Sequence, residues 1–148
     1  MTFQRLAAAS VIVSATILSG CGGDDLAGPG NGGGAPDVVG SYDLQSVNGD
    51  NLPATILQTP DGIVELISSN LLIRSDGNFV LDAAARATLT DGTSETVSDV
   101  TTGTWVLSGS TIVLVFDTGG CSESGTVSSN RITIEQDCDF GWRLVYEK

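Results

Sequence analysis

The sequence predicts an all-β fold, a single antiparallel up-and-down β-barrel of about eight or nine strands. From Val38 onward, β-branched and aromatic residues are interrupted by turn signals about every eight to twelve residues. No window of about ten residues after Val38 has a helical period, and the alanine-rich segment 80–89 fits a period of two better. Consecutive hairpins with one apolar face hide their edges most economically by closing into a barrel.

Turn signals divide this region into strands, because each signal combines residue types that accept turn geometry. The signals are Asn48-Gly49, Asp61-Gly62, Asp76-Gly77, Asp91-Gly92, Gly109-Ser110 and Ser129-Asn130. We expect strands at 40–47, 52–58, 63–67, 70–75, 78–90, 94–107, 111–116, 121–128, 131–138 and 142–147. One or two of these are expected to merge or to fail, and the strand 94–107 is expected to bend near Gly103.

The first 20 residues have the pattern of a secretory signal peptide. Residues 1–5 carry one positive charge, and 6–18 form an apolar run that is shorter than the about 20 residues a membrane-spanning helix needs. The run ends in Leu18-Ser19-Gly20-Cys21, which resembles the lipobox of bacterial lipoproteins. The resemblance implies that Cys21 carries acyl chains such as palmitate and tethers the protein to a membrane. The alternatives are an uncleaved membrane helix and a cysteine reserved for a disulfide.

Residues 21–37 are expected to be the lipidated cysteine and a flexible tether, because the segment is rich in Gly and Pro and has almost no apolar residues. Such a coil reaches about 20 Å, which lifts the folded domain 38–148 off the lipid headgroups. Gly22 and Gly23 follow the cysteine, where lipoproteins retained in the inner membrane tend to carry Asp. The resemblance therefore favours the outer membrane, and it leaves the periplasmic or surface side open.

Charge and composition exclude several classes of function. The 148 residues contain 18 Asp and Glu against 6 Lys and Arg, and the net charge of −12 argues against nucleic acid as a partner. The absence of His removes the commonest general base and the imidazole ligands of most zinc and copper sites. The nucleophile-elbow pattern G-x-S-x-G is also absent. We therefore expect no enzymatic activity, no cofactor and no metal.

Three carboxylates at a spacing of two leave one alternative to that expectation. Glu135, Asp137 and Asp139 would share one face of a strand. They could form half of a cation site, but the chain has no calcium-binding loop of the D-x-[DN]-x-[DN]-G type. The simpler interpretation is a solvated outer face.

Two strand motifs resemble known barrel proteins. Val39-Gly40-Ser41-Tyr42-Asp43-Leu44 resembles the first strand of lipocalin-like proteins. The segment 103–109, with Trp105 at its centre, resembles later strands of small bacterial lipocalin-like lipoproteins. The resemblance covers residues 38–148 and implies a barrel that binds a small apolar molecule. The helix that lipocalins place before their last strand has no counterpart here, which leaves the function as a carrier open.

Cys121 and Cys138 are expected to form a disulfide, as an exported compartment allows. With a two-residue turn at Ser129-Asn130, residues whose numbers add to 259 face each other, and 121 + 138 = 259. The pair falls at a non-hydrogen-bonded position, where Cα atoms lie about 4.5 Å apart, within disulfide range. The same register places Val127, Ile132 and Ile134 on the face of the cysteines.

The candidate ligand-binding residues are those expected to point into the barrel. They are Tyr42, Phe79, Leu81, Ala83, Ala85, Trp105, Phe116 and Trp142. Bulky aromatics fill a core, whereas small inward residues either admit bulky neighbours or leave a cavity. Two functions follow for a monomer anchored to the cell envelope. The leading one is a carrier or sensor of a small apolar ligand or envelope component, and the alternative is a solid-cored structural or protein-interaction module.

Overall fold

The computed structural model describes residues 37–136 and 141–148, and these residues fold as β-strands and connecting turns. The strands are β1 (Gly40–Val47), β2 (Asp50–Asn51), β3 (Ala54–Thr59), β4 (Gly62–Ile73), β5 (Asn78–Leu89), β6 (Ser94–Ser108), β7 (Thr111–Phe116), β8 (Ser122–Ser128), β9 (Arg131–Glu135) and β10 (Arg143–Glu147). Most of the predicted turns lie between consecutive strands, and Gly49, Gly77, Gly92 and Gly109 have the positive φ that turns require.

The predicted up-and-down barrel is confirmed. The strands β1, β10, β9, β8, β7, β6, β5 and β4 follow one another as antiparallel neighbours, and β4 pairs back to β1 from Asn70 to Ile73. This last pairing closes the barrel, so neither β1 nor β4 leaves a free edge along those residues. The two remaining strands are additions, since β2 pairs with the end of β1 and β3 pairs with the first half of β4.

The predicted strands at 63–67 and 70–75 are one strand, and the predicted break between them was wrong. β4 continues through this polar stretch with a bulge between Leu66 and Ser68. The strand persists because its polar side chains find partners on neighbouring strands. Ser69 is buried against the Tyr146 hydroxyl, while the Asn70 amide donates hydrogen bonds to Ser41 and Asp43. The predicted strand 52–58 corresponds to β3, which begins two residues later, and the two-residue strand β2 precedes it.

The barrel core is a closely packed set of alternating side chains. Its fully buried members include Tyr42 from β1, Leu71 from β4, Phe79 from β5 and Ile112 from β7. Phe79 and Phe116 meet edge to face with ring centroids 5.2 Å apart. The Phe79 ring also lies over Gly103, where an added Cβ would come within 2.6 Å of it. A glycine at 103 therefore lets the aromatic ring pack directly against the β6 backbone.

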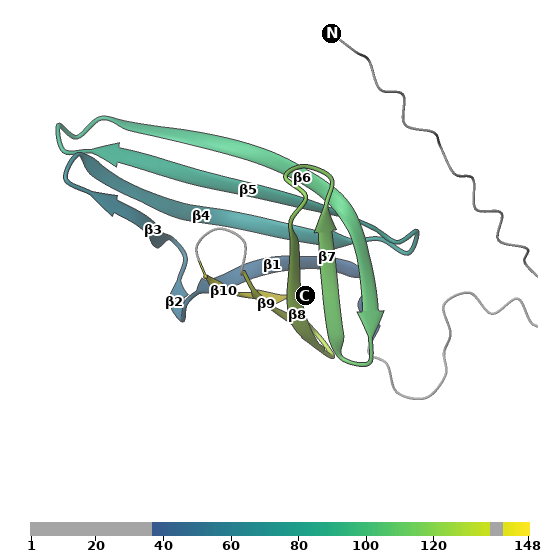
Figure 1. The fold of residues 1–148 in the computed structure, drawn as a ribbon. Coiled ribbons are helices and arrows are strands. Elements are labelled where there is room, and N and C mark those ends of the chain that lie inside the picture. Colours follow the sequence, from purple (N-terminus) through teal and green to yellow (C-terminus); the bar gives the residue numbers. More distant parts are fainter. Residues whose placement is uncertain (1–36, 137–140) are drawn as a thin grey trace, which may run out of the picture. The chain divides into compact units, whose positions relative to one another are not determined.

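Three strands, β4, β5 and β6, run beyond the barrel and form an extension of its sheet. β7 pairs with β6 only from Gly103 onward, and β1 pairs with β4 only from Asn70 onward. The first halves of β4 and β6 and the second half of β5 continue past the barrel, and β3 pairs with this part of β4 (Figure 1). We call this four-stranded part, residues 54–59, 62–68, 83–89 and 94–101, the sheet extension. Figure 1 shows β6 curving where it leaves the extension and enters the barrel.

The face of the extension that continues the barrel interior is apolar at its centre. Cross-strand pairs Leu66–Ala85, Val64–Ala87 and Ala85–Val97 place these side chains on one face. The same register adds Leu57 of β3 and Leu89 of β5, which are 51% and 50% exposed. We call this surface the inner face of the extension.

Candidate functional site

A cavity of about 290 Å³ opens at the end of the barrel from which the extension projects. Its apolar walls are Leu81 of β5 and Phe116 at the end of β7. Its other lining residues are Thr101, Thr118, Gly119, Cys121, Glu123 and Gln136. Leu81, Thr101, Phe116 and Glu123 occupy inward positions on neighbouring strands, so the cavity is the upper end of the barrel interior.

Glu123 brings a carboxyl group to this interior. It lies on β8 opposite Leu114 and is buried, although its neighbours in sequence Ser122 and Ser124 face solvent. Glu123 is not among the candidate residues predicted from the sequence. The sequence nevertheless indicates its inward position. The register that pairs residues whose numbers add to 259 places Glu123 on the same face as Cys121 and Val127.

A pair of hydroxyl groups lies elsewhere in the barrel interior, outside the lining of this cavity. The hydroxyls of Ser69 and Tyr146 are 3.2 Å apart and buried. Burial raises the pKa of the Tyr146 phenol from 10.0 to about 12; the hydrogen bond with Ser69 acts in the opposite direction, and the negative charge of Glu123 raises it again. Glu123, Ser69 and Tyr146 therefore give an otherwise apolar interior one acidic and two hydroxyl groups.

The cavity lining combines the apolar side chains of Leu81 and Phe116 with polar residues such as Thr101, and apolar walls with placed polar groups are typical of small-molecule sites. No family model, curated protein or solved structure matches this chain. Among the described residues, no group of three or more Cys, Asp or Glu side chains is arranged to hold a metal ion. Asp137 and Asp139 of the carboxylate series lie outside those residues.

The structure divides the predicted ligand-binding residues into four groups. Leu81 and Phe116 line the cavity, whereas Tyr42 and Phe79 are buried in the packed core below it. Ala83 and Ala85 lie on the inner face of the extension, next to Leu81 along β5. Trp105 and Trp142 are half-buried against the core. The Trp105 indole donates a hydrogen bond to the Arg74 carbonyl at 2.9 Å.

The predicted register of β8 and β9 is confirmed from Ser128–Arg131 to Ser124–Glu135. Val127, Ile132 and Ile134 are buried on the inward face, as expected. Cys121 is disulfide-bonded in the structure. Cys138 lies outside the described residues, so its pairing with Cys121 stays a prediction.

The signal peptide, Cys21 and the tether also lie outside the described residues. In the part of the chain that the structure describes, no helix has the length and apolarity needed to cross a membrane. The localisation and the anchor therefore remain predictions from the sequence.

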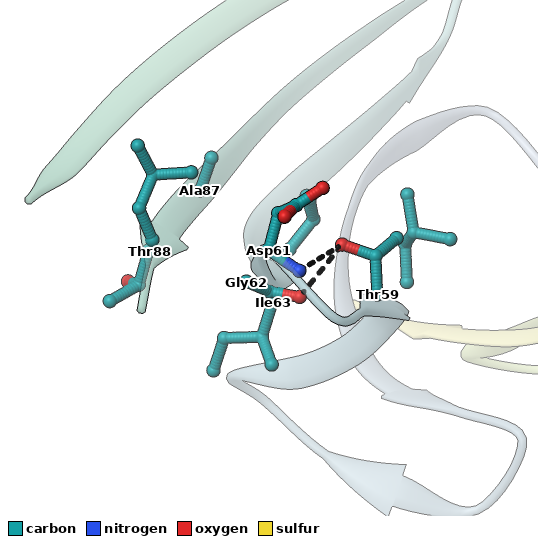
Figure 2. A pocket seen from close by; sticks show the side chains of 9 residues that line it. Thr59, Asp61, Gly62, Ile63, Ala87 and Thr88 are labelled. Atoms are coloured by element: carbon teal, nitrogen blue, oxygen red, sulfur yellow. Dashed lines mark hydrogen bonds between the residues drawn. The ribbon is translucent and has the colours of Figure 1, made fainter. Parts of the chain in front are cut away.

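A smaller hollow of about 80 Å³ lies at the far end of the extension, between β3, β4 and β5 (Figure 2). At its rim, the Thr59 hydroxyl donates a hydrogen bond to the Gly62 carbonyl and accepts one from the Asp61 amide. These bonds hold the turn between β3 and β4. The hollow is smaller than the roughly 300 Å³ of typical ligand pockets, so we regard it as part of the apolar inner face.

The outer surface carries several arginine–carboxylate pairs. Arg86 lies 2.8 Å from Glu65 on the outer face of the extension, and Arg143 lies 3.3 Å from Glu135 on the barrel. Arg131 pairs with Glu147, and Arg74 pairs with Asp76. The Arg86–Glu65 pair is partly buried, and the exposed pairs contribute little to stability, typically about 0–1 kcal/mol each. These pairs engage most of the few basic side chains of the chain. Most of the negative charge on its acidic side chains is therefore not neutralised.

Proposed function

We propose that the protein is a lipid-anchored, non-enzymatic component of a bacterial cell envelope that binds a small, mainly apolar molecule at the barrel mouth. The observation that carries this proposal is the cavity of about 290 Å³, in which Leu81 and Phe116 face a buried carboxyl group. The volume lies near the lower limit of about 300 Å³ for small-molecule pockets, which favours a small ligand.

The anchor rests on the lipobox-like segment that ends at Cys21. Several acyl chains on that cysteine would hold the protein stably, at about 0.8 kcal/mol for each buried CH₂ group. The net charge of −12 gives no attraction to anionic lipids, so the acyl chains have to supply the membrane affinity. Residues 22–37 would then act as the tether between membrane and barrel.

A second function is favoured by a different observation. The packed core below the cavity makes most of the barrel a solid scaffold. The inner face of the extension exposes apolar side chains such as Leu57 and Leu89, and exposed apolar patches mark interaction surfaces. A protein-interaction module of the envelope is therefore the alternative.

Native mass spectrometry of the full chain, purified from membranes in mild detergent, tests the ligand. We expect a noncovalent mass that disappears on denaturation, and we expect Leu81→Trp to remove it by filling the cavity. Leu57→Trp, on the extension, is the matched control and should retain the mass. A wild-type chain without any noncovalent mass, or equal retention by both variants, would contradict ligand binding at the mouth.

Membrane fractionation tests the anchor independently. Cys21→Ala should move the protein from the membrane fraction to the soluble or unprocessed fraction, because it removes the acylated side chain. Cys21→Ser retains the size of the side chain but not its lipidation, and should behave like the alanine variant. Wild-type-like membrane retention of both variants would show that the lipobox interpretation is wrong.

A further inference from the structure

One edge of the sheet extension is open and unprotected. β6 pairs with β5 from Ser94 to Thr104, but its other side has a partner strand only from Gly103 onward. Residues 94–100 are all exposed, and Val97 and Val100 are 57% and 59% exposed. A long open strand with apolar side chains is a ready template for another strand.

The hydrogen bonds show which backbone groups this edge offers. The Leu89 amide donates to the Thr93 carbonyl, and the Trp105 amide donates to the Gly77 carbonyl. Odd-numbered residues of β6 therefore point their backbone groups toward β5, since these groups alternate along a strand. Even-numbered residues point the other way, as the bond from the Asp117 amide to the Thr102 carbonyl confirms. Ser94, Thr96, Ser98 and Val100 thus present their amides and carbonyls at the open edge.

The opposite edge of the extension, β3, is built differently. Pro53 and Pro60 flank it, and a bulge between Thr55 and Leu57 interrupts its register. Prolines, bulges and short length are the usual protections of edge strands. The β5–β6 register has no irregularity, and β6 contains no proline. The β6 edge is therefore the one suited to strand addition.

The charged side chains of β6 determine which kind of strand can pair with its open edge. Glu95 and Asp99 lie on the inner face on either side of Val97, opposite Ala87 and Ala83 of β5. Neither carboxylate forms an ion pair with a described residue. The odd-numbered positions would form non-hydrogen-bonded pairs with an added antiparallel strand, where side chains approach most closely. A second copy pairing through the same edge would bring these carboxylates together, and like charges directly opposite are destabilising.

We propose that the β6 edge from Ser94 to Thr101 binds an extended, basic polypeptide segment by antiparallel strand addition. Lysine or arginine side chains of the segment would face Glu95 and Asp99, and an apolar side chain between them would face Val97. The backbone groups of Ser94, Thr96, Ser98 and Val100 supply the hydrogen bonds, as in other strand-addition complexes. The carboxylates then select a basic strand and reject an acidic one. This site adjoins the ligand cavity at the barrel mouth and shares Thr101 with it.

The test is a titration of the ¹⁵N-labelled full chain in neutral detergent, followed by NMR. The probe is the peptide Thr-Lys-Thr-Val-Thr-Lys-Thr, whose lysines can face both carboxylates in one register. We expect saturable shifts of the Ser94, Thr96, Ser98 and Val100 amide signals, without corresponding shifts in β3. The same peptide with glutamate in place of lysine should bind at least about tenfold more weakly, because two favourable pairs become repulsive.

Two variants separate the parts of the proposal. Ser98→Pro removes one edge amide without touching the β5 ladder and should abolish the shifts, whereas Ser98→Thr keeps the amide and should retain them. The double variant Glu95→Lys with Asp99→Lys should reverse the preference in favour of the glutamate peptide. Absence of saturable shifts, equal binding of both peptides, or edge shifts that depend on protein concentration alone would overturn the proposal. The last result would identify a second copy as the occupant.

Discussion

Phe79→Ala is expected to lower the free energy of unfolding by about 3–5 kcal/mol, the usual cost of deleting a buried aromatic ring. The Phe79 side chain is fully buried, stands edge to face against Phe116, and packs directly on the Gly103 backbone. Its neighbours are strands that are held in the closed barrel, so they have little freedom to collapse into the space. Small domains are stable by only about 5–15 kcal/mol, so this loss is a large fraction of the total.

Urea unfolding of the purified variant measures this effect. Val106→Ala is a suitable control, because Val106 is on the same sheet and is 63% exposed. It should cost less than about 1 kcal/mol, as surface substitutions usually do. A loss below about 2 kcal/mol for Phe79→Ala would contradict a closely packed interior at this position and would favour a larger cavity inside the barrel.

Stability is also expected to fall steeply between about pH 10 and pH 12. The pKa of Tyr146 is about 12 in the folded protein against 10.0 for an ordinary tyrosine. The raised pKa means that the folded state keeps the proton where the unfolded chain loses it. The protonated Tyr146 phenol therefore contributes fully to the free energy of unfolding below pH 10. This contribution is lost as the pH rises toward the pKa of the folded protein. A difference of two pKa units between the folded and unfolded states corresponds to a loss of about 2–3 kcal/mol in the free energy of unfolding.

Few other groups titrate in this window, because the chain contains two tyrosines and its only lysine is Lys148. Unfolding free energies measured at pH 9 and pH 11.5 should differ clearly for the wild type and much less for Tyr146→Phe. Tyr42→Phe is the matched control and should keep the pH dependence that Tyr146 causes. An unchanged slope in Tyr146→Phe would show that the buried phenol is not its source.

The sequence predicted the barrel well because turn chemistry and alternation are local signals. The predicted limits of 40–47 and 111–116 agree with β1 and β7, and the β8–β9 register was predicted from a single turn. The error at β4 has a physical origin. Ser69 and Asn70 look like a loop in isolation, and only their partners on distant strands show that they belong to a strand.

The candidate site was harder to predict because it depends on where neighbouring strands end. Leu81 and Ala83 alternate in the same way along β5, yet Leu81 lines the cavity and Ala83 lies on the extension. The difference arises because β6 gains its β7 partner only at Gly103, which no local pattern specifies. Glu123 was missed because a buried carboxyl group opposes the average preference of its residue type.

The pairing of β1 with β10 has a consequence for how the chain folds. β1 pairs with β10, so the first and last strands of the barrel meet although they are about a hundred residues apart in sequence. Lys148 reinforces this seam, since its ammonium group lies 5.1 Å from the centre of the Tyr42 ring. Co-translational folding therefore cannot complete the barrel before the final strand has been synthesised. A pair so distant in sequence forms late, because the entropy lost on closing the long intervening loop opposes it, and it therefore slows completion of the barrel.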